Sequence, residues 1–195
     1  MANFDKSFDG LLKLEFNSPK NALHQNKGES GLTYMGIYES VNPNFVGWIK
    51  IKDVLKTCGQ MEKASEILYK DEALKREVKE FYKANFWDSA NLGAIKNDRI
   101  ADLIFKFGVN THPKTAIKKA QKTVGVKEDG IIGKITLKAF SEISEKDFET
   151  KYKKEFEIFY MDLVRNNPEK YGRFSGGWLN RVKLSQADLD FIHLA

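Results

Sequence analysis

A single glutamate ends the apolar face of the first predicted helix. The apolar residues of that face are Phe4, Phe8, Leu11 and Leu12. Glu15 continues the face four residues after Leu11, so its carboxyl group is expected in the core or along its edge. Burial raises the pKa of a carboxyl group, as a general acid requires near neutral pH. If the helix frays before residue 15, Glu15 faces water and has no such role.

A polar, glycine-rich segment follows, from Phe16 to about Tyr38. Helical periodicity fails here, so we expect a long loop or a short β-hairpin. The segment contains four side chains that could act beside an acid: His24, Glu29, Thr33 and Tyr34. In a glycosidase one carboxylic acid protonates the leaving oxygen, and a second group activates or positions water. A glutamate at a helix end followed by this segment fits that arrangement.

Three of these side chains also have a purely structural interpretation. Taken alone, His24 is a surface residue, Glu29 is a solvated loop charge and Thr33 is an ordinary strand residue. The assignment therefore depends on the three lying together beside Glu15.

The rest of the chain is predicted to be almost entirely helical. Periodicity and capping residues indicate helices at 48–57, 61–84 with a break near Asp71, 98–109, 113–124 and 144–166, a short one after Gly133, and a last one that Ser185 caps. Strand character is confined to residues 32–38. A boundary is possible near residues 110–114, although no flexible linker marks it. The aromatic face of residues 148–163 needs a large partner surface, for which the N-terminal helices are the nearest candidate.

Composition excludes several classes of protein. The chain has 195 residues, of which 42% are apolar, enough for a folded core. It lacks any uncharged apolar run of about 18 residues, so we expect no membrane insertion. The single Cys58 excludes a disulfide framework and a cysteine-based zinc site, and we expect no metal or cofactor.

The net charge of +5 is compatible with an anionic partner, such as nucleic acid, a membrane surface or a cell-wall polymer, or with solubility alone. The lysines are spread along the chain, so we expect no nucleic-acid binding. The first ten residues lack a basic region followed by an apolar one. We therefore expect synthesis in the cytoplasm without a signal peptide, and release by another route, such as a holin.

Several motifs occur in a characteristic order. They are Leu14-Glu15, Thr33-Tyr34-Met35-Gly36-Ile37, the pairs Phe81-Tyr82 and Phe86-Trp87, and Phe107-Gly108-Val109-Asn110. The set resembles glycoside hydrolase family 108, the muramidases of phages and prophages. The second half contains Ala120-Gln121, Val124-Gly125-Val126, Asp129-Gly130-Ile131-Ile132-Gly133 and Gly177-Trp178-Leu179-Asn180-Arg181-Val182. These motifs resemble the peptidoglycan-binding segment that accompanies the family.

The resemblance implies a mostly α, lysozyme-like helical fold with a small β-hairpin or loop region near residues 24–38. Residues 1–110 would be the catalytic region, with a peptidoglycan-binding-like region, 111–195, packed on it in one unit. The implied activity is that of a monomeric endolysin, an N-acetylmuramidase that cuts the β-1,4 bond of the periplasmic cell wall. Glu15 would be the general acid, and Thr33 with Glu29 would position water. The substrate would be contacted by His24, Tyr34 and Asn110.

The sequence departs from the family pattern beside the acid. Glu15-Phe16-Asn17-Ser18 stands where the family has Glu-Gly-Gly-Tyr, and residues 26–31 replace its Asp-Pro-Gly-Gly. The second carboxylate therefore does not carry over by position, and Glu29 is the substitute candidate. The alternative is a non-catalytic peptidoglycan-binding or secretion-activating protein.

Overall fold

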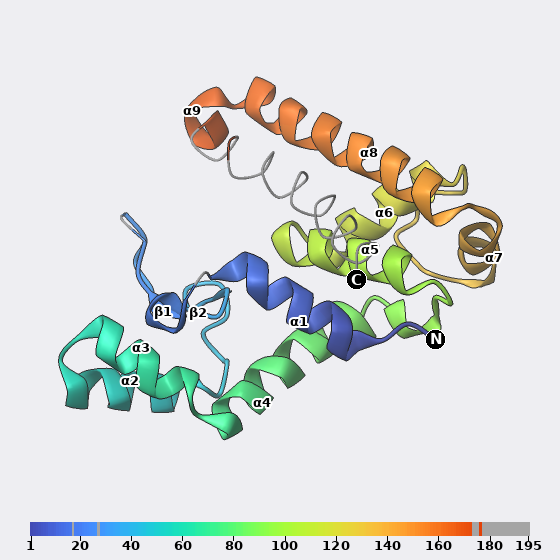
Figure 1. Ribbon diagram of the computed structural model, residues 1–195. Helices are drawn as coiled ribbons and strands as arrows, with labels where there is room; N and C mark the ends of the chain where they lie inside the picture. The colour runs from blue at the N-terminus through green and yellow to red at the C-terminus, as the bar shows by residue number, and fades with distance from the viewer. Residues whose placement is uncertain (17, 27, 173–175, 177–195) are drawn as a thin grey trace. The chain divides into compact units, whose positions relative to one another are not determined.

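The computed structural model describes residues 1–16, 18–26, 28–172 and 176, and most of them are helical (Figure 1). The elements are α1 (Phe4–Glu15), η1 (Pro19–Asn21), β1 (Leu23–His24), β2 (Thr33–Tyr34), β3 (Ile37–Tyr38), α2 (Trp48–Cys58), α3 (Met61–Tyr69), α4 (Glu72–Tyr82), the π-helical η2 (Lys83–Asp88), η3 (Leu92–Ala94), α5 (Asp98–Asn110), α6 (Pro113–Thr123), α7 (Lys134–Glu142), α8 (Glu145–Asn166) and α9 (Pro168–Tyr171). The expected helix capped by Ser185 and the Gly177–Val182 motif lie outside the described residues.

Side-chain caps set several of the helix starts that the sequence predicted. The Oδ1 atom of Asp71 accepts a hydrogen bond from the backbone N–H of Leu74 at 2.9 Å and begins α4, which confirms the break in 61–84. Asn97 caps α5 in the same way, and Ser144 caps α8. Each cap satisfies one of the backbone N–H groups that a helix start leaves without a partner.

The chain divides into two compact units. The N-terminal unit is Phe4–Trp87, and the C-terminal unit is Asp88–Ala195 together with Met1–Asn3. The expected functional division into residues 1–110 and 111–195 does not coincide with this structural division and stays a prediction.

The N-terminal unit buries the predicted apolar face of α1 against the end of α4. Phe8 and Tyr82 are in ring contact with centroids 5.7 Å apart, and Phe4 meets Trp87 edge-on at 5.4 Å. Trp87 is only 3% exposed. It is therefore a core residue. These aromatic contacts fix the direction in which α1 delivers its last residue, Glu15.

A three-stranded antiparallel sheet with the order β1-β2-β3 follows α1. Leu23 pairs with Tyr34, which pairs with Ile37, and all three side chains are buried. The sheet is tied to α3, because the backbone N–H of Leu23 donates to Ser65 Oγ at 2.9 Å. Ser65 in turn donates to the carbonyl of Pro19. The expected small β region near 24–38 is thus confirmed.

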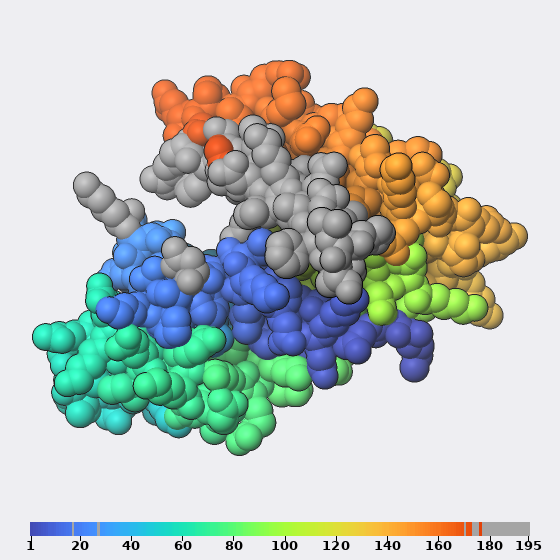
Figure 2. All heavy atoms as spheres, in the orientation of Figure 1, coloured from blue at the N-terminus to red at the C-terminus, as the bar shows by residue number. Residues whose placement is uncertain are grey.

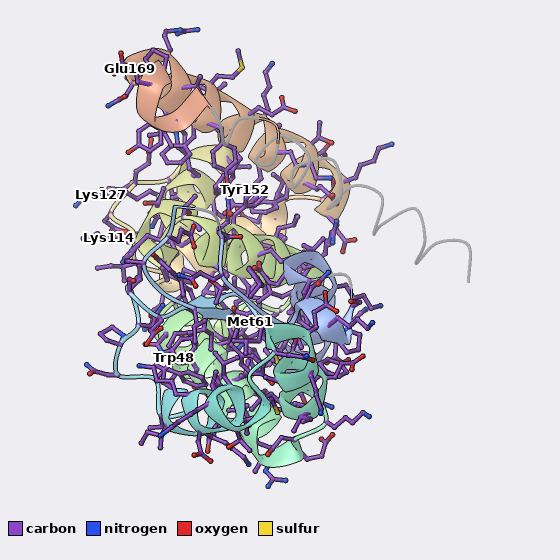
Figure 3. All side chains as sticks on the ribbon, turned by 90° about the vertical axis from the view of Figure 1, so that its left-hand side faces the viewer. Trp48, Met61, Lys114, Lys127, Tyr152 and Glu169 are labelled. Atoms are coloured by element: carbon purple, nitrogen blue, oxygen red, sulfur yellow. The ribbon has the colours of Figure 1, made fainter. Side chains whose placement is uncertain are left out.

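In the C-terminal unit, α5 is the buried central helix, and α6 and α8 pack on it. Phe107 of α5 stacks on Phe156 of α8 with ring centroids 3.6 Å apart. Tyr152, which lies among the helices of this unit in Figure 3, donates to the carbonyl of Ala116 in α6 at 3.0 Å. Phe107 of α5 and Ala116 of α6 therefore contribute to the surface that covers these rings of α8. The expected packing of this face on the N-terminal helices stays a prediction.

Charged side chains reinforce the contact between α5 and α8. Arg99 makes two hydrogen bonds to the carboxylate of Glu149, at 2.8 and 3.1 Å, and both side chains are buried. The outer side of α8, orange in Figure 2, is mostly polar and exposed. Among the described residues, no helix combines the length and the apolar character that a membrane crossing requires.

Candidate active site

Glu15 is the last residue of α1, and its half-buried carboxyl group lies against the turn between β2 and β3. A Cβ atom placed on Gly36 of that turn would lie 2.8 Å from Glu15 Oε2. The same point is 2.5 Å from the hydroxyl oxygen of Tyr82 at the end of α4. The ends of two helices and one hairpin turn therefore meet at this carboxylate. The position along the core edge agrees with the helical periodicity.

The turn that meets Glu15 has an uncommon backbone conformation. Met35 and Gly36 have φ angles of 47° and 85°, both left-handed, as in a two-residue type I′ hairpin turn. Glycine adopts this conformation freely, whereas for Met35 it costs about 1–2 kcal/mol. The structure holds Met35 on both sides: its carbonyl accepts from the Tyr82 hydroxyl at 2.9 Å, and its N–H donates to Ala22 at 2.7 Å. Strained backbone that is held in this way is often found at functional sites.

Thr33 lies on the face of the sheet opposite to Tyr34, and it is buried as well. It pairs with His24 on one side and with Tyr38 on the other. Because side chains alternate along a strand, these three share one face. Thr33 is 7% exposed, and His24 and Tyr38 are half-buried. The Thr33 hydroxyl forms no hydrogen bond with another described residue.

His24 is held in one orientation by the backbone. Its Nδ1 atom lies 3.0 Å from the carbonyl oxygen of Asn21. A carbonyl only accepts, so Nδ1 carries the proton and Nε2 is the acceptor of the neutral ring. The structure thus places His24 beside Thr33, as a substrate-binding role would require, and that role stays a prediction.

Glu29 lies in the loop between β1 and β2, and its described contacts all lie within that loop. Asn26 Nδ2 donates to its carboxylate at 3.1 Å, and Gln25 Nε2 donates to its carbonyl at 3.0 Å. In Figure 1 this loop extends away from α2 and α3. The side chain is half-buried and stabilises the loop. Its assignment as the second catalytic carboxylate remains a prediction.

Tyr34 is a core residue, which corrects its assignment as a substrate contact. Its side chain has no exposed surface, and its hydroxyl donates to the carbonyl of Leu68 at 3.0 Å. Burial, and to a smaller extent the nearby Asp71 and Tyr69, raises the pKa of this phenol far above its ordinary value. Tyr34 therefore stays neutral and joins the sheet to α3. The sequence could not show which face of so short a strand is buried.

Asn110 ends α5 in the C-terminal unit, where its amide donates to the hydroxyl of Tyr160 on α8. That contact ties the end of α5 to α8. The expected substrate contact by Asn110 stays a prediction.

The structure adds one carboxylate that sequence reasoning missed. Glu39, directly after β3, accepts from the N–H of Leu32 at 3.1 Å and pairs with Lys52 on α2. The hydrogen bond from Lys52 and then that from Leu32 hold the pKa of Glu39 below its ordinary value. Glu39 therefore stays ionised and fixes the backbone beside Thr33. No spacing in the sequence linked Glu39 to Lys52, because they lie on different elements.

Among groups of histidine, cysteine, aspartate and glutamate in the described part of the chain, no cluster has the arrangement of a metal site. The chemistry at hand is therefore that of a half-buried carboxyl group, a hydroxyl and an oriented imidazole.

Comparison with known proteins agrees with this chemistry. Residues 22–111 match the model of the family described as Glycosyl hydrolase 108. The chain is a glycoside hydrolase, and the matched segment, just under half of its length, is similar to family 108. The match contains the sheet, the Met35–Gly36 turn and Asn110. Glu15 lies seven residues before its first residue, so the match does not test the role of the acid.

No curated protein matches the chain in sequence. Among solved structures, the chain is similar to SagA of Brucella abortus, with a TM-score of 0.64 and 19% identity. The similarity covers 95% of this chain and 92% of SagA. At this identity it concerns the fold, and it confirms the expected mostly α, lysozyme-like helical fold.

Proposed function

We propose that this glycoside hydrolase is an N-acetylmuramidase that cleaves the β-1,4 bond of bacterial peptidoglycan, with Glu15 as the general acid. One observation carries the proposal: the carboxyl group of Glu15 lies against the turn of the hairpin that bears Thr33. A helix-end acid and a hydroxyl on a neighbouring hairpin are the two groups that this hydrolysis needs. The positive net charge favours approach to an anionic cell wall.

In the proposed reaction Glu15 gives its proton to the glycosidic oxygen as the bond to the sugar breaks. Thr33 holds the attacking water by its hydroxyl, and Glu39, through its bond to Leu32, holds the backbone beside Thr33 in place. Glu29 is the further carboxylate that would reach the sugar if its loop closes over the substrate. The ring of His24 contacts a sugar hydroxyl through Nε2. No step requires a cofactor.

We also propose that the chain acts as a monomeric endolysin of phage or prophage origin. It would reach the periplasmic wall after release by a holin or another route. Residues 111–195 would add peptidoglycan affinity.

The decisive experiment is the exchange Glu15→Gln. Glutamine keeps the size of the side chain but cannot donate the proton, so lysis of a peptidoglycan suspension should fall by roughly 10²–10⁴-fold. Glu62→Gln is the matched control, because Glu62 is an exposed carboxylate in the first turn of α3. Mass spectrometry of the wild-type products should find fragments with N-acetylmuramic acid at the reducing end.

A folded Glu15→Gln variant with near-wild-type lysis would contradict the assignment of Glu15 as the general acid. If the wild type binds peptidoglycan but releases no sugar fragments, the alternative of a binding or secretion-activating protein holds.

A further inference from the structure

Three polar side chains share the face of the sheet opposite to Leu23, Tyr34 and Ile37; the central one, Thr33, is buried, and the outer two are half-buried. The register places His24 opposite Thr33 and Thr33 opposite Tyr38. The alternate positions, Leu23, Tyr34 and Ile37, are all buried. An imidazole, a hydroxyl and a phenol therefore stand side by side across three strands, and we call them the saccharide strip.

We propose that Tyr38 is a sugar-binding residue of this chain, and that the saccharide strip contacts the sugar ring next to the scissile bond. The inference rests on the proposed function and extends it to a residue that sequence reasoning did not single out. It is carried by the register of Tyr38, by the hydrogen bonds that hold its backbone, and by its place two residues after Gly36, which lies against Glu15.

The chemistry of the strip suits a carbohydrate. Adjacent strands lie about 4.8 Å apart, so the strip is about 10 Å wide, which is comparable with the length of a disaccharide. Tyr38 is half-buried, and its hydroxyl forms no hydrogen bond with another described residue. An aromatic ring of this kind can stack on the apolar face of a sugar and still hydrogen-bond through its polar end. At the other edge, His24 offers Nε2 as an acceptor for a sugar hydroxyl.

The backbone of Tyr38 is rigidly held, so its ring is pre-organised. The Tyr38 carbonyl accepts from the backbone N–H of Asn42 at 3.0 Å and from its side-chain amide at 3.1 Å. Asn42 is anchored in turn, because its carbonyl accepts from the indole of the buried Trp48 at 2.7 Å. A side chain on a fixed backbone loses less conformational entropy when it binds a ligand.

The strip also begins near the proposed acid. Tyr38 follows Gly36 by two residues, so their Cα atoms are at most about 7 Å apart. Gly36 is the residue whose backbone lies against the Glu15 carboxylate. The hairpin turn that lies against the proton donor therefore leads directly into the strand of Tyr38.

The test compares Tyr38→Ala, Tyr38→Leu and Tyr38→Phe in the full chain. The probe is peptide-free glycan strands prepared from peptidoglycan, with KM and kcat measured by release of reducing ends. The affinity of the strands is measured separately by calorimetry in the Glu15→Gln background. Loss of the ring should raise KM and weaken binding roughly tenfold, as for the loss of a central aromatic contact.

Tyr38→Phe keeps the ring and should stay within about threefold of the wild type. Tyr38→Leu keeps apolar bulk in the strand, so it yields a folded variant even if Tyr38→Ala does not. If the wild type cleaves the strands while the folded Leu variant keeps wild-type KM and affinity, the strip is overturned and the proposed function stands. If the wild type fails to cleave but the Ala and Leu variants bind more weakly, the proposed function fails and the sugar-binding role of Tyr38 stands.

Discussion

The backbone of Gly36 lies directly against the carboxyl group of Glu15. A Cβ atom at Gly36 would lie 2.8 Å from Oε2 and 3.0 Å from Cδ of Glu15, closer than non-bonded carbon and oxygen atoms approach. The conformation of the hairpin turn and the position of the proposed acid are therefore coupled. This contact yields the first of our predictions.

Gly36→Ala should displace Glu15 and remove most of the activity. Alanine at φ +85° is strained by about 1–2 kcal/mol, and its methyl group would also collide with Glu15 and Tyr82. Gly59→Ala is the matched control, because Gly59 also has a left-handed φ of 66° but has open space around its Cβ position. Lysis assays and thermal melts of both variants would separate backbone strain from displacement. Equal activity of the two folded variants would mean that the contact has no catalytic importance.

Thr33→Ala and Glu29→Gln should differ in their effect on lysis. Removal of one hydrogen bond to water should lower the rate roughly five- to tenfold in Thr33→Ala. Glu29→Gln lowers the rate only if the loop carboxylate reaches the sugar. Comparison of kcat at saturating peptidoglycan distinguishes a catalytic carboxylate from a loop charge. If both variants keep the wild-type rate, residues 24–34 do not form the second half of the site.

Ser65→Ala should destabilise the sheet by about 1–3 kcal/mol. The exchange leaves the buried N–H of Leu23 without its acceptor and the carbonyl of Pro19 without its donor. The midpoint of thermal unfolding should fall by about 2–4 °C for each kcal/mol. Ser141→Ala is the control, because the Ser141 hydroxyl is exposed and donates only to Lys138 of its own helix. A Ser65→Ala midpoint equal to that of the control would contradict the role of this contact.

The free energy of unfolding should decrease as the pH falls below about 4.5. The ion pair with Lys52 lowers the pKa of Glu39 from its ordinary 4.5, and Lys50 lowers that of Asp71 from 3.8. The pKa of each carboxyl group is therefore lower in the folded state than in the unfolded state. The stabilisation is complete at pH values above the unfolded-state pKa, and it is lost as the pH falls through the folded-state pKa. The decrease should be modest and smaller at high salt, because both pairs are partly exposed.

Urea titrations at several pH values would measure this slope. In Glu39→Gln the slope below pH 4.5 should be smaller than in the wild type. An unchanged slope would assign the acid sensitivity to other groups.

A fragment of residues 88–195 should fold, whereas 114–195 should not. The shorter fragment lacks α5 and thus Phe107, whose ring stacks on Phe156, and Arg99, which pairs with Glu149. Deletion of one such buried aromatic side chain alone costs about 3–5 kcal/mol. Circular dichroism and thermal melts of the two fragments provide the test. A folded 114–195 that binds peptidoglycan would instead be a separate binding domain.

The sequence also predicts that the full chain unfolds as one cooperative unit. Calorimetry should then record a single transition. Two separable transitions would show that the two compact units unfold independently.

The sequence by itself determined the local elements and the place of the acid within them. The 3.6-residue spacing of Phe4, Phe8 and Leu11 sets the buried face of α1, and it places Glu15 at the edge of that face. Likewise, Asp71 ends one helix and begins the next because its carboxylate bonds to a backbone N–H three residues later. Such interactions connect residues a few positions apart, so the spacing of residue types is enough to reveal them.

Tertiary structure decided which of the hairpin side chains are available for chemistry. Tyr34 and Thr33 are neighbours in one strand, yet the packing of the sheet on α3 buries Tyr34 and leaves Thr33 beside His24 and Tyr38. The contact of Gly36 with Glu15 likewise joins elements that are distant along the chain. These contacts depend on the packing of whole elements against each other, and no local spacing of residues encodes that packing.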